Sequence, residues 1–191
     1  MSDAFKEDIE KACEVLRQGG VILYPTDTVW GIGCDATNAE AVERVYRIKQ
    51  RDDSKALVIL LGDRRDLWRY VDDVPEIAEQ LLDVTVRPTT IIYDHARNIA
   101  RNAVAEDGSV AIRVTDESFS RALCRRFRRP LVSTSANISG KPTPATFSRI
   151  PDEIKQQVDY IVEARRNDTT PARPSIIMKI SSDSTFKIIR K

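Results

Sequence analysis

The chain has 191 residues, of which 41% are hydrophobic and 31% are charged. This length suffices for one substantial core and is short for two, so we expect a single domain over residues 1–191. Thirty basic and twenty-nine acidic side chains give a net charge of +1. This balance excludes a uniformly basic nucleic-acid coat, although it leaves a local basic cleft open.

The cysteines and the single histidine exclude several kinds of site. Cys13, Cys34 and Cys124 are odd in number and lack C-x-x-C spacing, and His95 lies in a polar stretch where we expect it on the surface. A zinc site or a Ser-His-Asp triad is therefore not expected. The N-terminus has no apolar signal core and no run approaches the length of a membrane span, which indicates a cytoplasmic protein without membrane contact.

An amphipathic helix and a buried strand open the chain. Residues 4–18 place apolar side chains at helical spacing, and two glycines then end the helix. Residues 21–24 form a continuous apolar run, typical of a strand buried on both faces, and Pro25 stops it. The loop 25–36 supplies threonine hydroxyls and the Asp27 carboxylate at the carboxyl end of that strand, where open α/β sheets bind ligands. The alternative is that these side chains only cap the turn.

A basic stretch, residues 49–55, follows a second helix that Asn38 can cap. Another apolar strand is expected directly after it, at 56–61. A helix end, several cations and a buried strand together favour a phosphate-binding clamp, because the scaffold fixes the cations in place. Charges that merely offset the helix dipole and face solvent are the alternative.

The middle of the chain places an arginine inside a buried strand. Residues 63–84 predict two helical pieces separated by a proline, with Trp68 among the core candidates. Strands are expected at 89–93 and 108–114, and Arg113 lies in the second. An arginine in a strand otherwise built for burial usually has a carboxylate or phosphate partner.

Two polar clusters follow. Asp116 is the expected cap of a helix whose other face, up to Arg129, is rich in arginine. Such a cluster contacts RNA phosphates in some proteins, but it is more often a solvated face at the C-terminus of a helix. The short strand 130–132 then enters the loop 133–140, whose hydroxyls and backbone N–H groups form either an anion site or an ordinary turn.

The last part of the chain predicts a short helix near 151–157 and three strands. These strands are expected at 159–162, 175–180 and 185–190, the last two as a hairpin. Helices therefore alternate with strands in an α/β manner, with an antiparallel end.

The ordered set of motifs resembles the YrdC/Sua5 family of threonylcarbamoyl-AMP synthases in its single-domain form. The motifs that carry the resemblance are segments 24–31 (Tyr-Pro-Thr-Asp-Thr-Val-Trp-Gly), 49–51 (Lys-Gln-Arg), 108–113, 133–140 and 174–175. The resemblance implies an α/β fold with a twisted mixed sheet, flanking helices and a concave basic cavity. It also implies that L-threonine, bicarbonate or CO2, and ATP react to threonylcarbamoyl-AMP and pyrophosphate, for the N6-threonylcarbamoyladenosine modification of tRNA.

The resemblance further implies roles for single side chains. Lys49 and Arg51 are implied to be catalytic. The implied ATP-binding residues are Lys49, Arg51, Lys55, Ser135, Asn137, Thr143 and Arg190. The implied threonine-binding residues are Thr28, Arg113, Ser133 and Ser175. Mg²⁺ is expected to accompany ATP, and no acidic cage for a metal is evident in the sequence.

Departures from the family pattern leave alternatives open. Asp52 and Ala56 stand where prolines are common in the family, and Thr115 and Ile176 also differ, which puts loop rigidity and rate in question. Implied partners are a tRNA threonylcarbamoyl-transfer protein complex and, by direct contact, tRNA. The alternatives to a synthase are a module that binds tRNA or double-stranded RNA, and a nucleotide-binding regulator without turnover.

Overall fold

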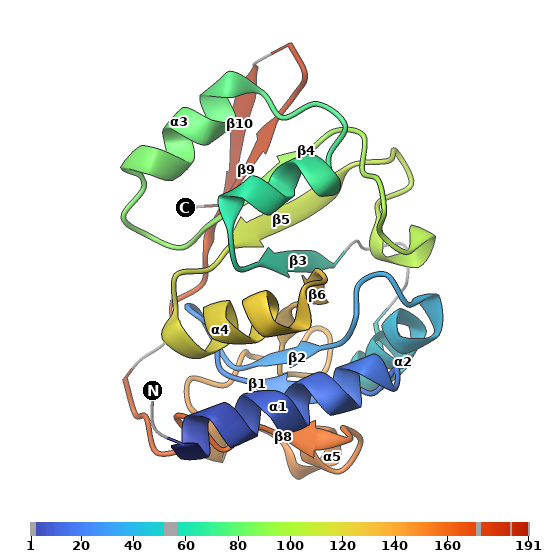
Figure 1. The fold of residues 1–191 in the computed structure, drawn as a ribbon, viewed down its shortest axis with the longest axis vertical. Helices are drawn as coiled ribbons and strands as arrows, with labels where there is room; N and C mark the ends of the chain where they lie inside the picture. The colour runs from blue at the N-terminus through green and yellow to red at the C-terminus, as the bar shows by residue number, and fades with distance from the viewer. Residues whose placement is uncertain (1–2, 52–56, 171–172, 184, 191) are drawn as a thin grey trace.

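The chain builds two mixed β-sheets that share an apolar core, with helices on their outer faces (Figure 1). This computed structural model describes residues 3–51, 57–170, 173–183 and 185–190. Mixed strands and flanking helices are the α/β architecture that the sequence predicts. The division of the strands between two sheets, instead of one, was not predicted.

The smaller sheet has the strand order β7-β2-β1-β8. Its strands are β1 (Ile22–Tyr24), β2 (Gly31–Gly33), β7 (Thr134–Ser135) and β8 (Tyr160–Ile161). β1 runs antiparallel to β2 and parallel to β8, and β2 runs antiparallel to β7. The loop between β1 and β2 therefore leaves this sheet at one end and returns to it beside β7.

The larger sheet has the order β10-β9-β4-β5-β3-β6. Its strands are β3 (Val58–Leu61), β4 (Thr89–Tyr93), β5 (Val110–Val114), β6 (Leu131–Val132), β9 (Ile176–Ile180) and β10 (Phe186–Arg190). The pairs β3–β5 and β4–β9 are parallel, and the other pairs are antiparallel. Since β6 belongs to this sheet and β7 to the smaller one, the chain crosses between the sheets at Ser133.

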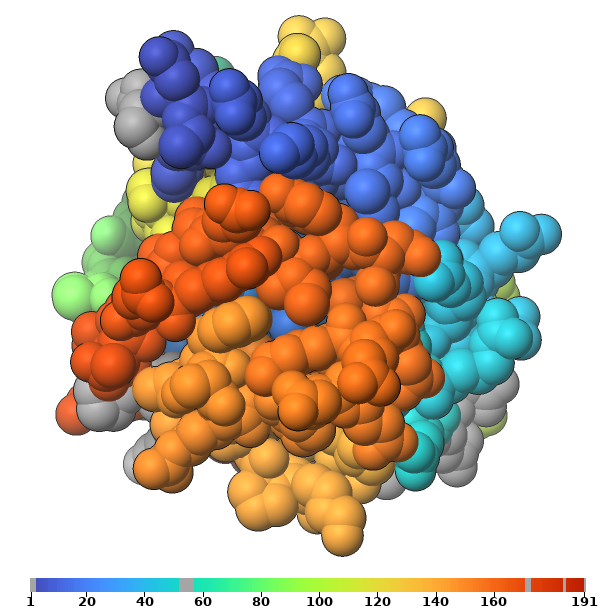
Figure 2. Space-filling view, turned by 90° about the horizontal axis from the view of Figure 1, so that it is seen from below, coloured from blue at the N-terminus to red at the C-terminus, as the bar shows by residue number. Residues whose placement is uncertain are grey.

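The helices lie around both sheets. The α-helices are α1 (Asp3–Arg17), α2 (Ala39–Lys49), α3 (Glu76–Val84), α4 (Ser118–Phe127) and α5 (Asp152–Lys155), and the 3₁₀ helices are η1 (Arg64–Arg69), η2 (Arg101–Ala103) and η3 (Phe147–Arg149). α1 packs against α4, where the rings of Phe5 and Phe119 meet edge to face. Seen from below in Figure 2, the orange stretch of chain after residue 140 closes this end of the molecule between α1, in dark blue, and α2, in light blue and cyan.

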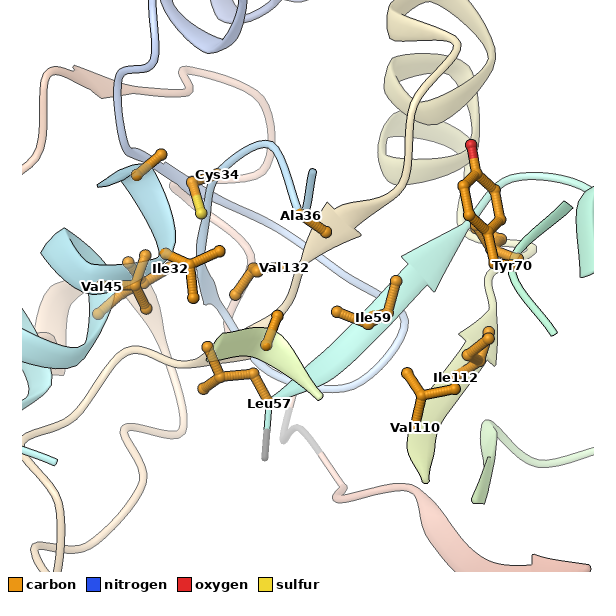
Figure 3. Packing of buried hydrophobic residues seen from close by; sticks show 14 of the residues in the cluster. Ile32, Cys34, Ala36, Val45, Leu57, Ile59, Tyr70, Val110, Ile112 and Val132 are labelled. Carbon is orange, nitrogen blue, oxygen red and sulfur yellow. The ribbon is translucent and has the colours of Figure 1, made fainter. Parts of the chain in front are cut away.

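The main core lies between the two sheets and α2. Side chains of β2, β3, β5 and β6, among them Ile32, Ile59, Ile112 and Val132, pack together there (Figure 3). Each of these four is at most 2% exposed, so burial of their apolar area holds the sheets together. No helix in the described part of the chain combines the length and the apolarity needed to cross a membrane.

Most predicted elements are confirmed. Asn38 caps α2 through its side-chain oxygen, which accepts hydrogen bonds from the backbone N–H groups of Glu40 and Ala41. The C-terminal hairpin is present as β9 and β10, and His95 is exposed. The strand expected at 56–61 begins at Val58, and residues 52–56 lie outside the described part.

Three expectations were wrong for physical reasons. Glu117, not Asp116, caps α4, because it directly precedes the first helical residue and its carboxylate reaches the N–H groups of Phe119 and Ser120. Trp68 is 45% exposed, since the first piece of 63–84 is a 3₁₀ helix, whose turn differs from the α-helical spacing assumed. Strand β2 was missed because it begins and ends with glycine. Gly33 is required there: a Cβ would lie 2.5 Å from Tyr24 Cε1.

Candidate functional site

A cavity of about 420 Å³ lies where the two sheets meet. Its walls come from the loop after β1, the chain crossing at Ser133, strands β3 and β5, and the β9–β10 hairpin. The residues implied by the family resemblance that line it are Thr28, Arg51, Arg113, Ser133, Ser135, Thr143, Ser175 and Arg190. Side chains assigned to threonine and to ATP therefore share one space, although they come from segments far apart in the sequence.

Lys49 and Asn137 lie behind the wall of this cavity. Lys49 is 2% exposed, and its ammonium donates hydrogen bonds to the backbone carbonyls of Ser135 and Asn137, the latter at 2.8 Å. In return, the N–H of Ser139 donates to the Lys49 carbonyl at 2.8 Å. The end of α2 is thus tied to the loop 133–140. Lys55, the remaining residue of the implied set, lies outside the described residues.

Burial changes the acidity of Lys49. Desolvation, together with the nearby charge of Arg51, lowers the pKa of Lys49 to about 8 from its ordinary value of 10.5. The ammonium is retained at neutral pH, and mildly alkaline solution removes its charge. The hydrogen bonds between α2 and the loop therefore involve a group that titrates close to physiological pH.

The loop 133–140 is also braced from within. The side-chain amide of Asn137 donates to the carbonyls of Ile138 and Lys141 at 2.9 and 2.8 Å. Its Oδ1 is buried without a hydrogen-bond partner among the described residues. The amide nitrogen of Asn137 therefore acts as it would in an ordinary turn, since it bonds only to neighbouring carbonyls of the same loop. Ser135, in contrast, lines the cavity.

Arg113 has the carboxylate partner that its place in a buried strand predicts. It lies opposite Leu60 on β3 and Thr90 on β4, so its backbone is fixed on both sides. Its Nε lies 3.0 Å from Asp27 Oδ1, and its Nη2 lies 3.5 Å from the Ser133 hydroxyl. Burial raises the pKa of Asp27 above its ordinary value, and the opposing attraction of Arg113 acts to lower it.

Ser175 is held from two sides. Its hydroxyl lies 2.9 Å from the Thr90 hydroxyl. The guanidinium of Arg190 donates to the Ser175 carbonyl from Nε at 3.2 Å and from Nη2 at 2.9 Å. Thr90, which holds the Ser175 hydroxyl, is also the cross-strand neighbour of Arg113, so strand β4 places the two threonine-assigned residues near each other.

The turn after β1 is capped by its own polar residues, as one interpretation expects, and it also contributes to the cavity wall. Thr26 caps the turn: its hydroxyl donates to the Val29 carbonyl at 2.7 Å and accepts the Thr28 N–H at 3.1 Å. Arg165 adds a hydrogen bond from Nη1 to the Thr26 carbonyl at 3.1 Å. Thr26 and Thr28 both line the cavity. The turn is thus braced by hydrogen bonds, and it places two threonine side chains at the cavity wall.

Two supporting residues were not singled out from the sequence. The Thr90 hydroxyl bonds to that of Ser175, next to β9, and Arg165 reaches the turn from more than a hundred residues away. Neither has a local motif, so only tertiary contacts reveal them.

The arginines of α4, and Arg129 just beyond its end, are paired with carboxylates. The pairs are Arg121–Asp116 at 3.3 Å, Arg125–Asp63 at 3.1 Å, Arg126–Glu10 at 2.6 Å and Arg129–Asp35 at 2.8 Å. Each pair offsets a positive charge that a phosphate would otherwise meet. This arrangement favours the solvated helix face over an RNA-contacting cluster.

Comparisons with known proteins agree with the motifs. The family model of Sua5, YciO and YrdC proteins, described as "Telomere recombination", matches residues 14–191. A protein of Pseudoalteromonas translucida (strain TAC 125) named threonylcarbamoyl-AMP synthase is 35% identical over 98% of this chain and 100% of its own length. A protein of the same name from Vibrio parahaemolyticus serotype O3:K6 (strain RIMD 2210633) is 33% identical over 97% of this chain and 99% of its own length.

Solved structures show the same fold. E. coli YciO superposes with a TM-score of 0.82 at 27% identity, over 96% of this chain and 88% of that one. P. abyssi Sua5 complexed with L-threonine superposes with a TM-score of 0.81 at 25% identity, over 90% of this chain, and this chain spans 50% of that protein's length. The resemblance seen in the motifs is confirmed: the chain belongs to the Sua5/YciO/YrdC family.

Proposed function

We propose that the chain is a threonylcarbamoyl-AMP synthase, a nucleotidyltransferase that uses ATP, L-threonine and bicarbonate or CO2. The observation that carries this proposal is the shared cavity, in which Arg113 and three hydroxyl groups, of Thr28, Ser133 and Ser175, face the same space as Arg51. One arginine suits the carboxylate of an amino acid, and the other suits a phosphate. The names of the relatives with full-length similarity support the same activity.

The proposed reaction joins two anions. The threonine amine attacks the carbon of CO2 and loses a proton, which gives a carbamate. A carbamate oxygen then attacks the α-phosphorus of ATP, and the bond from that phosphorus to the pyrophosphate oxygen breaks. Holding the reactants in line and offsetting their charges lowers this barrier without a protein nucleophile.

The described side chains divide into two groups for this work. Arg113 binds the threonine carboxylate, and the hydroxyls beside it orient the amino acid. Arg51 and Arg190 offset charge on the phosphates, while Ser135 and Thr143 donate hydrogen bonds to them. Lys49 holds the loop that carries Ser135.

Magnesium belongs to the substrate in this proposal. The described residues contain no group of three or more His, Cys, Asp or Glu side chains that could hold a metal ion. In the proposal Mg²⁺ therefore enters together with ATP, as part of that substrate. The product is then consumed by a tRNA threonylcarbamoyl-transfer protein complex, which forms N6-threonylcarbamoyladenosine in tRNA.

A labelling experiment tests the proposal. Purified protein is incubated with ¹⁴C-bicarbonate, L-threonine and MgATP, and nucleotides are separated by chromatography. We expect label in an AMP-containing product only when threonine is present. Labelled bicarbonate that never enters a nucleotide product would overturn the proposal and favour a regulator that binds nucleotide without turnover.

A further inference from the structure

A buried carboxylate stands behind the arginine of the cavity. The side chains of Asp27 and Arg113 are 12% and 5% exposed, and Asp27 Oδ1 lies 3.0 Å from Arg113 Nε. Neither atom makes a well-aligned hydrogen bond to any described group. The contact is therefore an ion pair in which each group is the nearest opposite charge of the other.

Asp27 does not line the proposed substrate space, although Arg113 does. Asp27 lines two smaller neighbouring hollows of about 290 and 400 Å³, whereas Arg113 lines the cavity between the sheets. Asp27 therefore reaches that cavity through Arg113. Any effect of Asp27 on a ligand there is expected to depend on Arg113.

The backbone that carries Asp27 is fixed. On one side, the Thr26 hydroxyl donates to the Val29 carbonyl at 2.7 Å, and on the other Arg165 donates to the Thr26 carbonyl at 3.1 Å. Arg165 also lies 3.4 Å from Glu117, the other acidic group whose charge acts on Asp27. The carboxylate is thus placed by a rigid turn instead of a free loop.

The ion pair determines which nitrogens of Arg113 remain for a ligand. A guanidinium carries donors on Nε and on two terminal nitrogens, and a carboxylate pairs best with two donors side by side. With Nε beside Asp27, Nη2 lies 3.5 Å from the Ser133 hydroxyl at the cavity. A buried arginine without its counter-charge would lose both this orientation and the compensation of its charge.

We propose that Asp27 is a positioning residue for amino-acid binding, which offsets the charge of Arg113 and turns its terminal nitrogens toward the carboxylate of the amino acid. This inference rests on the proposed function, because it takes Arg113 as the group that binds that carboxylate. Charge alone argues in the opposite direction, since a second anion near the ligand repels it. If Asp27 orients Arg113, removing Asp27 weakens threonine binding. If Asp27 acts only by its charge, removing it strengthens that binding.

The experiment measures L-threonine and ATP binding by calorimetry for wild type, Asp27→Ala, Asp27→Asn, Arg113→Ala and the double variant Asp27→Ala/Arg113→Ala. Asp35→Asn is the matched control, since Asp35 is also buried and paired with an arginine, Arg129 at 2.8 Å, away from the cavity. Thermal unfolding checks that each variant is folded. If Asp27→Ala does not fold, Asp27→Asn, which keeps the shape of the side chain, takes its place.

We expect Asp27→Ala to weaken threonine binding about tenfold or more, Asp27→Asn to weaken it less, and both to leave ATP binding within about twofold. In the Arg113→Ala background, Asp27→Ala should cause no further loss. Threonine affinity equal to or above wild type in either Asp27 variant, equal loss of ATP affinity, or multiplying losses in the double variant would overturn the inference. A wild-type protein that binds no threonine would instead contradict the proposed function itself.

Discussion

The ammonium of Lys49 donates a 2.8 Å hydrogen bond to the backbone carbonyl of Asn137, and a second bond reaches the carbonyl of Ser135. The loop that carries Ser135 into the cavity is thus held from behind by the last turn of α2. The resemblance implies that Lys49 touches ATP, whereas these bonds give it a second task, which is to shape the phosphate-facing loop. Both tasks require the same charge.

Replacing Lys49 tests this task. We expect Lys49→Ala to lower the rate of adenylate formation about a hundredfold or more, because two buried carbonyls lose their donor and the phosphate side loses a charge. The free energy of unfolding should fall by about 2 kcal/mol. Arg47→Ala, an exposed change two residues away in the same helix, is the control and should alter neither. Normal activity in Lys49→Ala would contradict both tasks.

The acidity of Lys49 gives a pH dependence. Because the pKa in the folded chain is about 8 against an ordinary 10.5, the unfolded chain holds more protons between these values, and the contribution of Lys49 to stability rises with pH there. Activity should move in the opposite direction, with kcat/KM for ATP falling as pH passes about 8. The measurement is a pH–rate profile beside urea unfolding at pH 7 and 9. In Lys49→Arg, which stays charged, the alkaline fall should move to higher pH; an unchanged fall would assign it to another group.

Asp8 is expected to stabilise the fold without affecting the site. It is 5% exposed and accepts hydrogen bonds from the Tyr160 hydroxyl at 2.7 Å and from the N–H groups of Glu163 and Ala164 at 3.0 and 2.8 Å. Asp8→Ala leaves these donors without an acceptor, so we expect a loss of about 3 kcal/mol in urea unfolding. Glu7→Ala, exposed on the same helix, should change stability little. Equal midpoints for the two variants would refute this account.

The paired arginines of α4 predict weak RNA binding by that face. We expect Arg125→Ala/Arg126→Ala to change tRNA affinity by less than about twofold, because these guanidinium groups already face carboxylates. Filter binding at increasing KCl concentrations measures both the affinity and its salt dependence. A steep salt dependence that disappears in this variant would instead identify α4 as an RNA-contacting surface.

The sequence was most informative where one segment determines its own structure. Helix α2 was predicted with its cap, since Asn38 acts on the next three residues. Strand β4 was predicted because five adjacent residues favour an extended chain. Strand β2, in contrast, depends on Gly33, where a Cβ would lie 2.5 Å from Tyr24 Cε1 and 2.7 Å from the Val132 carbonyl oxygen, and no local pattern indicates these tertiary contacts.

The site was predictable to a similar extent. Motifs placed the hydroxyls and arginines that line the cavity, and the buried strand position predicted a partner for Arg113. The sequence did not reveal that this partner is Asp27, or that Lys49 faces the carbonyls of the loop, because both contacts bridge segments more than eighty residues apart. Such contacts depend on how the two sheets meet.

The central claim is that one cavity binds threonine, bicarbonate and ATP together. An assay of pyrophosphate release tests this claim most directly. The assay follows pyrophosphate from MgATP with each of the other substrates omitted in turn. We predict release, with formation of threonylcarbamoyl-AMP, only when L-threonine and bicarbonate are both present, and its loss in Arg51→Ala. Release that ignores threonine, or no release with all substrates present, would contradict the account.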